Sequence, residues 1–197
     1  MQVIDMHPSP RIDAHMLTLN EPAEWRDACI ESLSGAPVRL HVLPGIPDRL
    51  GEARARGYAL GELPLLTFVD PDDTYEAGSF AMLADALDAS PSSVLAYADE
   101  GLLDEQGRRI GTRRLAYSPF MHAHSASHVH GLIVMRREHV AALAGSVHPQ
   151  DQTPDWTLTR MLARRGGVIH LPIIGRHWRQ HPGQYHRRIR GVTHAAN

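Results

Sequence analysis

Apolar and polar residues follow two different periods along the first half of the chain. Short apolar runs bounded by turn residues are typical of strands, and longer segments with apolar residues three and four positions apart are typical of helices. This pattern predicts strands at residues 14–19, 38–43, 65–69 and 93–97 and helices at residues 22–33, 50–60 and 77–89. Asn20 is expected to cap the first helix and Gly61 to end the second. The alternation favours a mostly parallel sheet with helices on both faces.

The order of elements changes in the second half. Residues 102–111 predict a small hairpin, and residues 116–127, rich in Ser and His, predict a long loop. Further strands are predicted at residues 129–135, 168–171 and 173–178, and further helices at residues 137–144 and 155–165. We find no internal repeat and no linker, so the chain is expected to form one domain.

Three carboxylates, Asp70, Asp72 and Asp73, directly follow the apolar run 65–69. A short run of this composition is typical of a strand buried on both faces. Open α/β sheets bind ligands at the carboxyl ends of such strands. Crowded carboxylates repel one another unless a cation lies between them, and Mg²⁺ or Mn²⁺ also binds phosphate oxygens. A solvated, Asp-rich turn is the alternative interpretation.

Composition narrows the class of protein. The chain has 197 residues, of which 43% are hydrophobic and 21% charged, as in ordinary globular domains. A formal net charge of -2 gives no overall attraction to nucleic acid or an anionic membrane. The single cysteine, Cys29, excludes an internal disulfide framework and is expected to be a buried packing thiol. Without a membrane-spanning run or a signal-peptide core, a cytoplasmic location is expected.

Histidine is unusually frequent between residues 122 and 130. His122 and His124, and likewise His128 and His130, would share a face of an extended chain, and such pairs can bind zinc. They lack the close Cys or carboxylate partners of a convincing zinc site. A loop that contacts an acceptor and a plain surface loop are the two interpretations left open.

Seven segments form a pattern through their shared order and spacing over roughly residues 12–186, rather than through any one motif. The segments are residues 17–21, 51–57, 68–73, 97–100 with Gly107, 131–137, 154–158 with 164–166, and 178–181. Together they resemble the GT-A glycosyltransferases, most closely the family-2 group of inverting, nucleotide-sugar-dependent enzymes. The resemblance implies one compact GT-A domain over residues 1–197, Rossmann-like, with a mixed, mostly parallel sheet, a core at about 12–186 and a tail at 187–197.

The resemblance also implies an activity: metal-dependent, inverting transfer of a sugar from a nucleotide sugar, most readily a UDP sugar, to a hydroxyl. Asp155 is the expected general base, with a plain helix N-cap as its alternative role. A divalent Mn or Mg ion is expected on Asp70, Asp72 and His181. Donor contacts are expected from Leu19, Asn20, Glu21, Arg54, Arg56, Asp70 and Arg179. Acceptor-side contacts are expected from Asp99, His130, Gly131 and Trp156.

The sequence departs from the family pattern in three places. The acidic D-D-G-S segment after the second strand is missing at residues 43–48, Pro154 replaces a Glu, and Ala55 replaces an Asn. These departures keep a non-catalytic nucleotide-sugar-binding module as the alternative function. A nucleotidyltransferase is disfavoured because residues 13–26 hold no Gly-rich phosphate loop.

The acceptor is left open by the sequence. A glycan, a lipid-linked sugar, a protein and a modified nucleobase all fit, and Arg187, Arg188 and Arg190 in the tail would suit an acceptor that carries phosphate.

Overall fold

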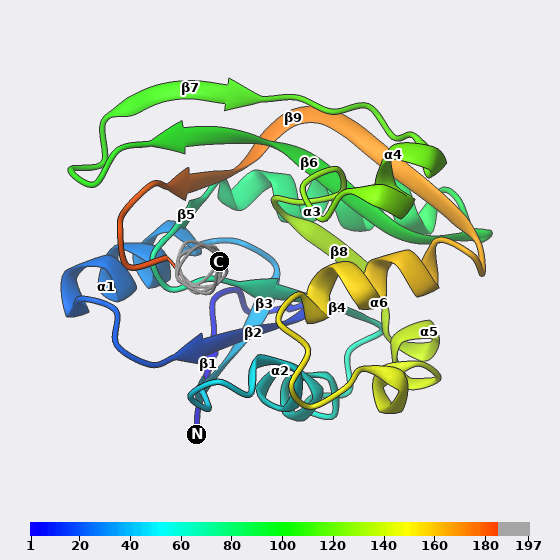
Figure 1. Ribbon diagram of the computed structural model, residues 1–197, viewed down its shortest axis with the longest axis horizontal. Helices are drawn as coiled ribbons and strands as arrows, with labels where there is room; N and C mark the ends of the chain where they lie inside the picture. Colours follow the sequence, from blue (N-terminus) through cyan, green and yellow to red (C-terminus); the bar gives the residue numbers. More distant parts are fainter. Residues whose placement is uncertain (185–197) are drawn as a thin grey trace, which may run out of the picture.

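A computed structural model describes residues 1–184, so the tail predicted at 187–197 lies outside the described residues. One curled, nine-stranded sheet runs through the molecule, with helices packed against it (Figure 1). The strands are β1 (Gln2–Asp5), β2 (Ile12–Thr18), β3 (Val38–Pro44), β4 (Leu65–Val69), β5 (Thr74–Tyr75), β6 (Ser93–Leu103), β7 (Arg109–Arg113), β8 (Ile133–Arg136) and β9 (Gly167–Arg179). The helices are α1 (Ala23–Ser32), α2 (Leu50–Tyr58), α3 (Ala77–Asp88), α4 (Pro119–His124), α5 (Arg137–Ala141) and α6 (Pro154–Leu162), with a 3-10 turn η1 (Ala144–Ser146).

The sheet is mixed. Its strand order is β1-β3-β2-β4-β8-β6-β9-β5, with β7 paired to β6. The parallel pairing expected for the first half holds in β3-β2-β4, and β6 pairs with β9 in parallel. The strands β1 and β5, which the sequence pattern missed, add antiparallel pairs, as do β7 and β8. The expected α/β sheet flanked by helices is confirmed, but the sheet is not mostly parallel, because three of its strand pairs are parallel and five are antiparallel.

Two apolar clusters cover the two faces of the sheet. One joins α1 and α3 to the sheet through residues such as Leu33, Phe80 and Leu87, and includes Cys29, which is buried as expected. The other joins α2, α5 and α6 through residues such as Tyr58 and Leu158. The strand β4 contributes Leu65 to the first cluster and Leu66 to the second. This strand is therefore buried on both faces, as its composition predicts.

Several predicted boundaries are wrong for identifiable reasons. The helix α1 begins at Ala23 with Pro22 as its N-cap, and Asn20 does not cap it. The predicted loop 116–127 contains α4, because Ser118 caps a helix that has proline in its first turn. The segments 168–171 and 173–178 form one strand, β9, whose register shifts around Pro172, which has no N–H to donate.

No helix among residues 1–184 is long and apolar enough to cross a membrane.

Candidate active site

The candidate site begins where β4 ends. Asp70 follows Val69, and its backbone N–H donates to the hydroxyl of Tyr75 at 2.8 Å. Its two carboxylate oxygens accept from two different arginines, Arg54 at 2.8 Å and Arg176 at 2.9 Å. Burial alone would raise the pKa of Asp70, but these two guanidinium groups hold it below its usual value. Asp70 is therefore an ionised carboxylate between two cations.

Asp72 and His181 meet on the other side of this turn. Asp72 Oδ2 lies 2.9 Å from His181 Nε2, and the His181 ring packs against Trp25 with ring centroids 4.7 Å apart. The chain thus brings together two of the three residues predicted to bind a metal ion. Within residues 1–184, no three His, Cys, Asp or Glu side chains are grouped as a metal site. A carboxylate beside an imidazole fits a divalent ion that takes its other ligands from phosphate and water.

Asp73 holds the turn in place. It is buried, its Oδ1 accepts from the backbone N–H of Arg179 at 2.8 Å, and its Oδ2 lies 3.4 Å from Arg176 Nε. Burial raises the pKa of Asp73 well above its usual value, and the charges of Asp72 and Asp70 add to this against the opposing charge of Arg176. Asp73 thus links the carboxylate turn to β9.

Arg179, expected to contact the donor, is committed to the protein instead. Its side chain donates to the carbonyls of Asp72 at 3.0 Å and Glu105 at 3.2 Å, and its guanidinium lies over the Trp25 ring at 5.1 Å.

Asp155 lies in the first turn of α6, whose N-cap is Thr153. The alternative role of a plain N-cap is therefore wrong. Asp155 Oδ1 lies 3.0 Å from Arg54 Nε, and Oδ2 accepts from Arg54 Nη2 at 3.2 Å. Burial, with help from the charge of Asp70, raises the pKa of Asp155 against the opposing effect of Arg54. Asp155 and Asp70 thus share one arginine.

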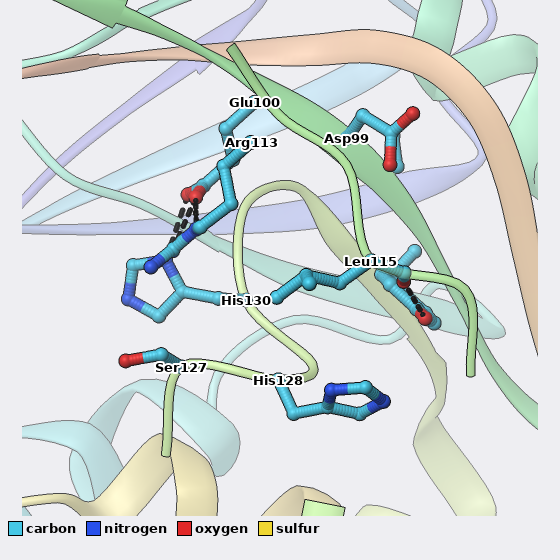
Figure 2. Close-up of a pocket in the computed structure, with 9 residues that line it drawn as sticks. Asp99, Glu100, Arg113, Leu115, Ser127, His128 and His130 are labelled. Carbon is cyan, nitrogen blue, oxygen red and sulfur yellow. Dashed lines mark hydrogen bonds and ion pairs between the residues drawn. The ribbon is translucent and has the colours of Figure 1, made fainter. Parts of the chain in front are cut away.

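A small pocket opens between β6 and the loop before β8 (Figure 2). Glu100 is buried in its wall, and its Oε1 accepts from Arg176 at 2.9 Å while its Oε2 accepts from Arg113 at 2.7 Å. His130 Nδ1 lies 2.7 Å from Glu100 Oε1. Burial would raise the pKa of Glu100, but His130, Arg176 and Arg113 hold it well below its usual value.

Two of the four predicted acceptor-side residues line this pocket. Asp99 and His130 line it, and Asp99 Oδ1 lies 2.7 Å from His170 Nε2. Gly131 has φ +80°, and a Cβ there would lie 2.8 Å from Glu100, so only glycine lets the chain pass so close. Trp156 donates to the carbonyl of His122 at 2.8 Å and thereby ties α6 to α4.

The two predicted donor arginines of α2 point to different places. Arg54 is buried and faces Asp70 and Asp155, whereas Arg56 is exposed and pairs with Glu52 at 2.7 Å. Residues two apart on a helix point about 200° apart, which explains the difference.

The predicted donor segment 19–21 lies at the end of β2. The backbone N–H of Leu19 donates to the Glu21 carboxylate at 2.8 Å, Asn20 lies between them, and about half of the Leu19 side chain is exposed.

The histidines of residues 122–130 do not act as one group. His122 is buried, His124 contacts the carbonyl of Phe120 at 2.8 Å, and His128 Nε2 accepts from the backbone N–H of Ser118 at 2.9 Å. Among these four, His130 is the one that joins the carboxylate network.

Sequence reasoning missed Arg113 and Arg176 and gave Glu100 no primary role. Glu100 follows Asp99 within a segment that carries the family resemblance, which is a usable signal. An arginine buried among carboxylates leaves no periodic pattern, so no comparable signal exists for Arg176.

No known protein family and no curated protein matches the sequence of this chain. Solved structures do match its fold. The S. aureus TarS fragment 1–349 in complex with UDP-GlcNAc aligns with a TM-score of 0.66 and 12% identity over 89% of this chain and 60% of that one. The same fragment in another crystal structure aligns with a TM-score of 0.63 and 10% identity over 86% of this chain and 60% of that one. A crystal structure of S. aureus TarS that covers a longer chain aligns with a TM-score of 0.60 and 12% identity over 92% of this chain and 39% of that one.

The chain has a GT-A fold. The resemblance to GT-A glycosyltransferases is thus confirmed at the level of the fold, which is all that identities of 10% to 12% establish. The chain spans about 60% of the TarS fragment that it matches.

Proposed function

We propose that this protein is a glycosyltransferase that moves a sugar from a nucleotide-sugar donor to a hydroxyl acceptor. The observation that carries the proposal is the meeting of Asp70, at the end of β4, with Asp155, in the first turn of α6, on one buried arginine. This brings the donor-side carboxylate turn and a candidate base into a single site at the carboxyl end of a sheet strand. The complexes of TarS with UDP-GlcNAc and UDP support a UDP sugar as the donor.

We assign the role of general base to Asp155. Its carboxylate would accept the proton of the acceptor hydroxyl while the hydroxyl oxygen attacks the anomeric carbon. The bond from that carbon to the diphosphate breaks on the opposite face, so the configuration inverts. Burial raises the pKa of Asp155, which makes it a stronger proton acceptor than an exposed aspartate.

Asp72 and His181 are the residues we assign to a Mn or Mg ion, because one carboxylate oxygen and one imidazole nitrogen lie together there. When bound, such an ion supplies Lewis-acid stabilisation of the charge on the leaving diphosphate. Both oxygens of Asp70 already accept from arginines. We therefore place Asp70 beside the donor ribose rather than on the ion.

Asp99, His130 and the pocket they line are our candidate acceptor side. This pocket and the Asp70 turn are joined by Arg176, which contacts both Asp70 and Glu100. We therefore place the acceptor beside this pocket, next to the turn that carries Asp70.

A thermal-shift screen of nucleotide sugars, with and without Mn²⁺, tests the proposal, because binding to the native state raises its melting temperature. We expect a UDP sugar with Mn²⁺ to give the largest rise in melting temperature. We also expect the protein to hydrolyse this UDP sugar slowly when no acceptor is present. A shift without hydrolysis or transfer would support the non-catalytic binding module instead. No shift with any nucleotide sugar would contradict both readings.

A further inference from the structure

Arg54 occupies an unusual position for a residue expected to bind the donor. Its side chain is buried, with 6% of its surface exposed. Nη2 donates to Asp70 at 2.8 Å and to Asp155 at 3.2 Å, and Nε lies 3.0 Å from the second oxygen of Asp155. The guanidinium plane also lies 4.6 Å from the ring centroid of Phe68. Its charge is thus directed at protein carboxylates.

We propose that Arg54 is a positioning residue that acts through Asp155: its guanidinium fork holds the base charged and aimed, with Asp70 and Phe68 holding the fork. This inference rests on the proposed function, in which Asp155 is the base. It replaces the expected role of Arg54 as a direct donor contact.

The surroundings of Asp155 explain why it needs this partner. Asp155 faces Arg54 and Tyr58 from α2, Asp70 from the end of β4 and His130 from the loop before β8. Burial and the charge of Asp70 both favour the protonated carboxyl, whereas Arg54 is the largest influence that favours the carboxylate. Without Arg54, the pKa of Asp155 would be higher still, which would favour the protonated form that cannot act as a base.

The geometry requires an arginine rather than a lysine. Arg54 Nη2 donates to Asp155 Oδ2 and to Asp70 Oδ1, and Nε lies 3.0 Å from Asp155 Oδ1 as an ion-pair contact without hydrogen-bond geometry. A planar guanidinium offers these donors in a rigid fork, but an ammonium is a single point of charge. Lysine at this position would satisfy one carboxylate and release the other.

The test compares Arg54→Gln and Arg54→Lys with Arg49→Gln. Arg49 precedes the same helix, is half exposed and pairs with Glu52, so it is a matched control. Calorimetry with UDP measures donor-side binding, and the transfer assay measures kcat. We expect both Arg54 variants to lose about 10-fold or more in kcat, with UDP affinity within about threefold of wild type, and Arg49→Gln to match wild type.

A double variant separates positioning from a general loss of structure. If Arg54 acts through Asp155, then adding Arg54→Gln to Asp155→Asn should slow transfer by less than about twofold further. Losses that multiply would overturn the proposal, because Arg54 would then act at the donor.

If Arg54→Gln does not fold, the same measurements of kcat and UDP affinity on Arg54→Lys test the proposal. A wild-type kcat in Arg54→Lys would contradict the claim that a guanidinium fork is required. Failure of the proposed function is distinguishable, since the wild-type protein would then transfer no sugar, whereas normal transfer by Asp155→Asn alone would overturn only the assignment of the base.

Discussion

At the scale of single residues, four carboxylates within one site have four different surroundings. Arginines lower the pKa of Asp70, and His130 with two arginines lowers that of Glu100, whereas burial dominates for Asp73 and Asp155 and raises their pKa values. Neighbouring carboxyl groups with opposite shifts are typical of sites that need both fixed charge and proton transfer. Under the proposed function we assign the acid-base task to Asp155 rather than Asp73, because Asp73 accepts from the backbone N–H of Arg179.

Asp155→Asn is predicted to separate catalysis from binding. Asparagine has nearly the same shape, and its Oδ1 can still accept from Arg54, but it cannot take a proton. We expect transfer to fall by about 10²-fold or more, while UDP affinity stays close to wild type. Steady-state kinetics and calorimetry are the measurements. Transfer at the wild-type rate would move the search for the base to Asp151, Glu100 and the histidines of residues 122–130.

Asp72→Asn is predicted to remove the effect of metal on nucleotide binding. We expect Mn²⁺ to raise UDP affinity in wild type and to leave it unchanged in the variant, because an amide is a poor ligand for the ion. Calorimetry with UDP, with and without Mn²⁺, measures this, and His181→Ala should behave in the same way.

Asp88→Asn is the control for this prediction. Asp88 is the last residue of α3 and pairs with Arg11, and the side chain of Asp88 is 63% exposed. An equal response to Mn²⁺ in Asp72→Asn and wild type would place the ion elsewhere.

Sequence reasoning identified residues that lie within the segments of the family resemblance. It missed residues whose partners are set only by how the strands and helices pack together. Asp72 and His181 each belong to a segment of the family resemblance, and they meet. Arg176 lies in β9, yet it binds carboxylates from the β4 turn and from β6. That meeting depends on the pairing of β6 with β9, which no local pattern reports.

At the scale of elements, predictions held where an apolar segment has clear ends. The limits of β4 match the prediction, and α3 spans almost the predicted range, because each is an apolar segment with clear ends. The strands β1 and β5 were missed because β1 is an exposed edge strand and β5 has two residues. Both strands depend on tertiary pairing, since β1 pairs with β3 and β5 pairs with β9.

Gly61→Ala is predicted to be strongly destabilising. Gly61 has φ +80°, and a Cβ there would lie 2.1 Å from the carboxylate of buried Asp13. Asp13 also accepts from Arg137 at 2.7 Å and from the backbone N–H of Leu63 at 2.9 Å, so it cannot move aside. We expect a loss of about 2 kcal/mol or more in the free energy of unfolding, measured in urea.

Gly78→Ala is the matched control. Gly78 lies in the first turn of α3, and a Cβ there would meet nothing within 4 Å. Alanine should stabilise this helix by about 0.5 kcal/mol, because glycine loses more backbone freedom on folding. If both variants lost the same stability, the contact between Gly61 and Asp13 would not be the cause.

At the scale of the whole molecule, a second buried polar cluster shares no residue with the candidate site. Asp13 and His15 of β2 meet His41 of β3 and Arg137 of α5, with His41 Nε2 2.7 Å from Asp13 Oδ1 and the two imidazole rings stacked at 5.2 Å. This cluster ties the sheet to α5, and it makes the stability of the whole protein depend on pH.

The stability of the protein is predicted to fall between pH 7.5 and pH 5. Burial, with the charge of His41, lowers the pKa of His15 from 6.5 to about 4. As the pH falls below 6.5, His15 therefore binds a proton in the unfolded chain but not in the folded chain. The contribution of neutral His15 to the free energy of unfolding is fully present above pH 6.5 and is lost as the pH falls towards 4. This difference corresponds to a loss of about 2 kcal/mol by pH 5. Urea unfolding across this range measures it.

His15→Gln provides the control for this pH dependence. Glutamine can still hydrogen-bond to the carbonyl of Leu60, as His15 Nε2 does at 3.2 Å, but it does not titrate. The pKa of Asp13 is held below 3.8 because His41 and Leu63 outweigh its burial, so Asp13 stays charged throughout the range. The variant should therefore lose less stability than wild type between pH 7.5 and pH 5. Parallel pH profiles for the two proteins would contradict the assignment and point to another buried histidine, such as His122, whose pKa is also lowered by burial.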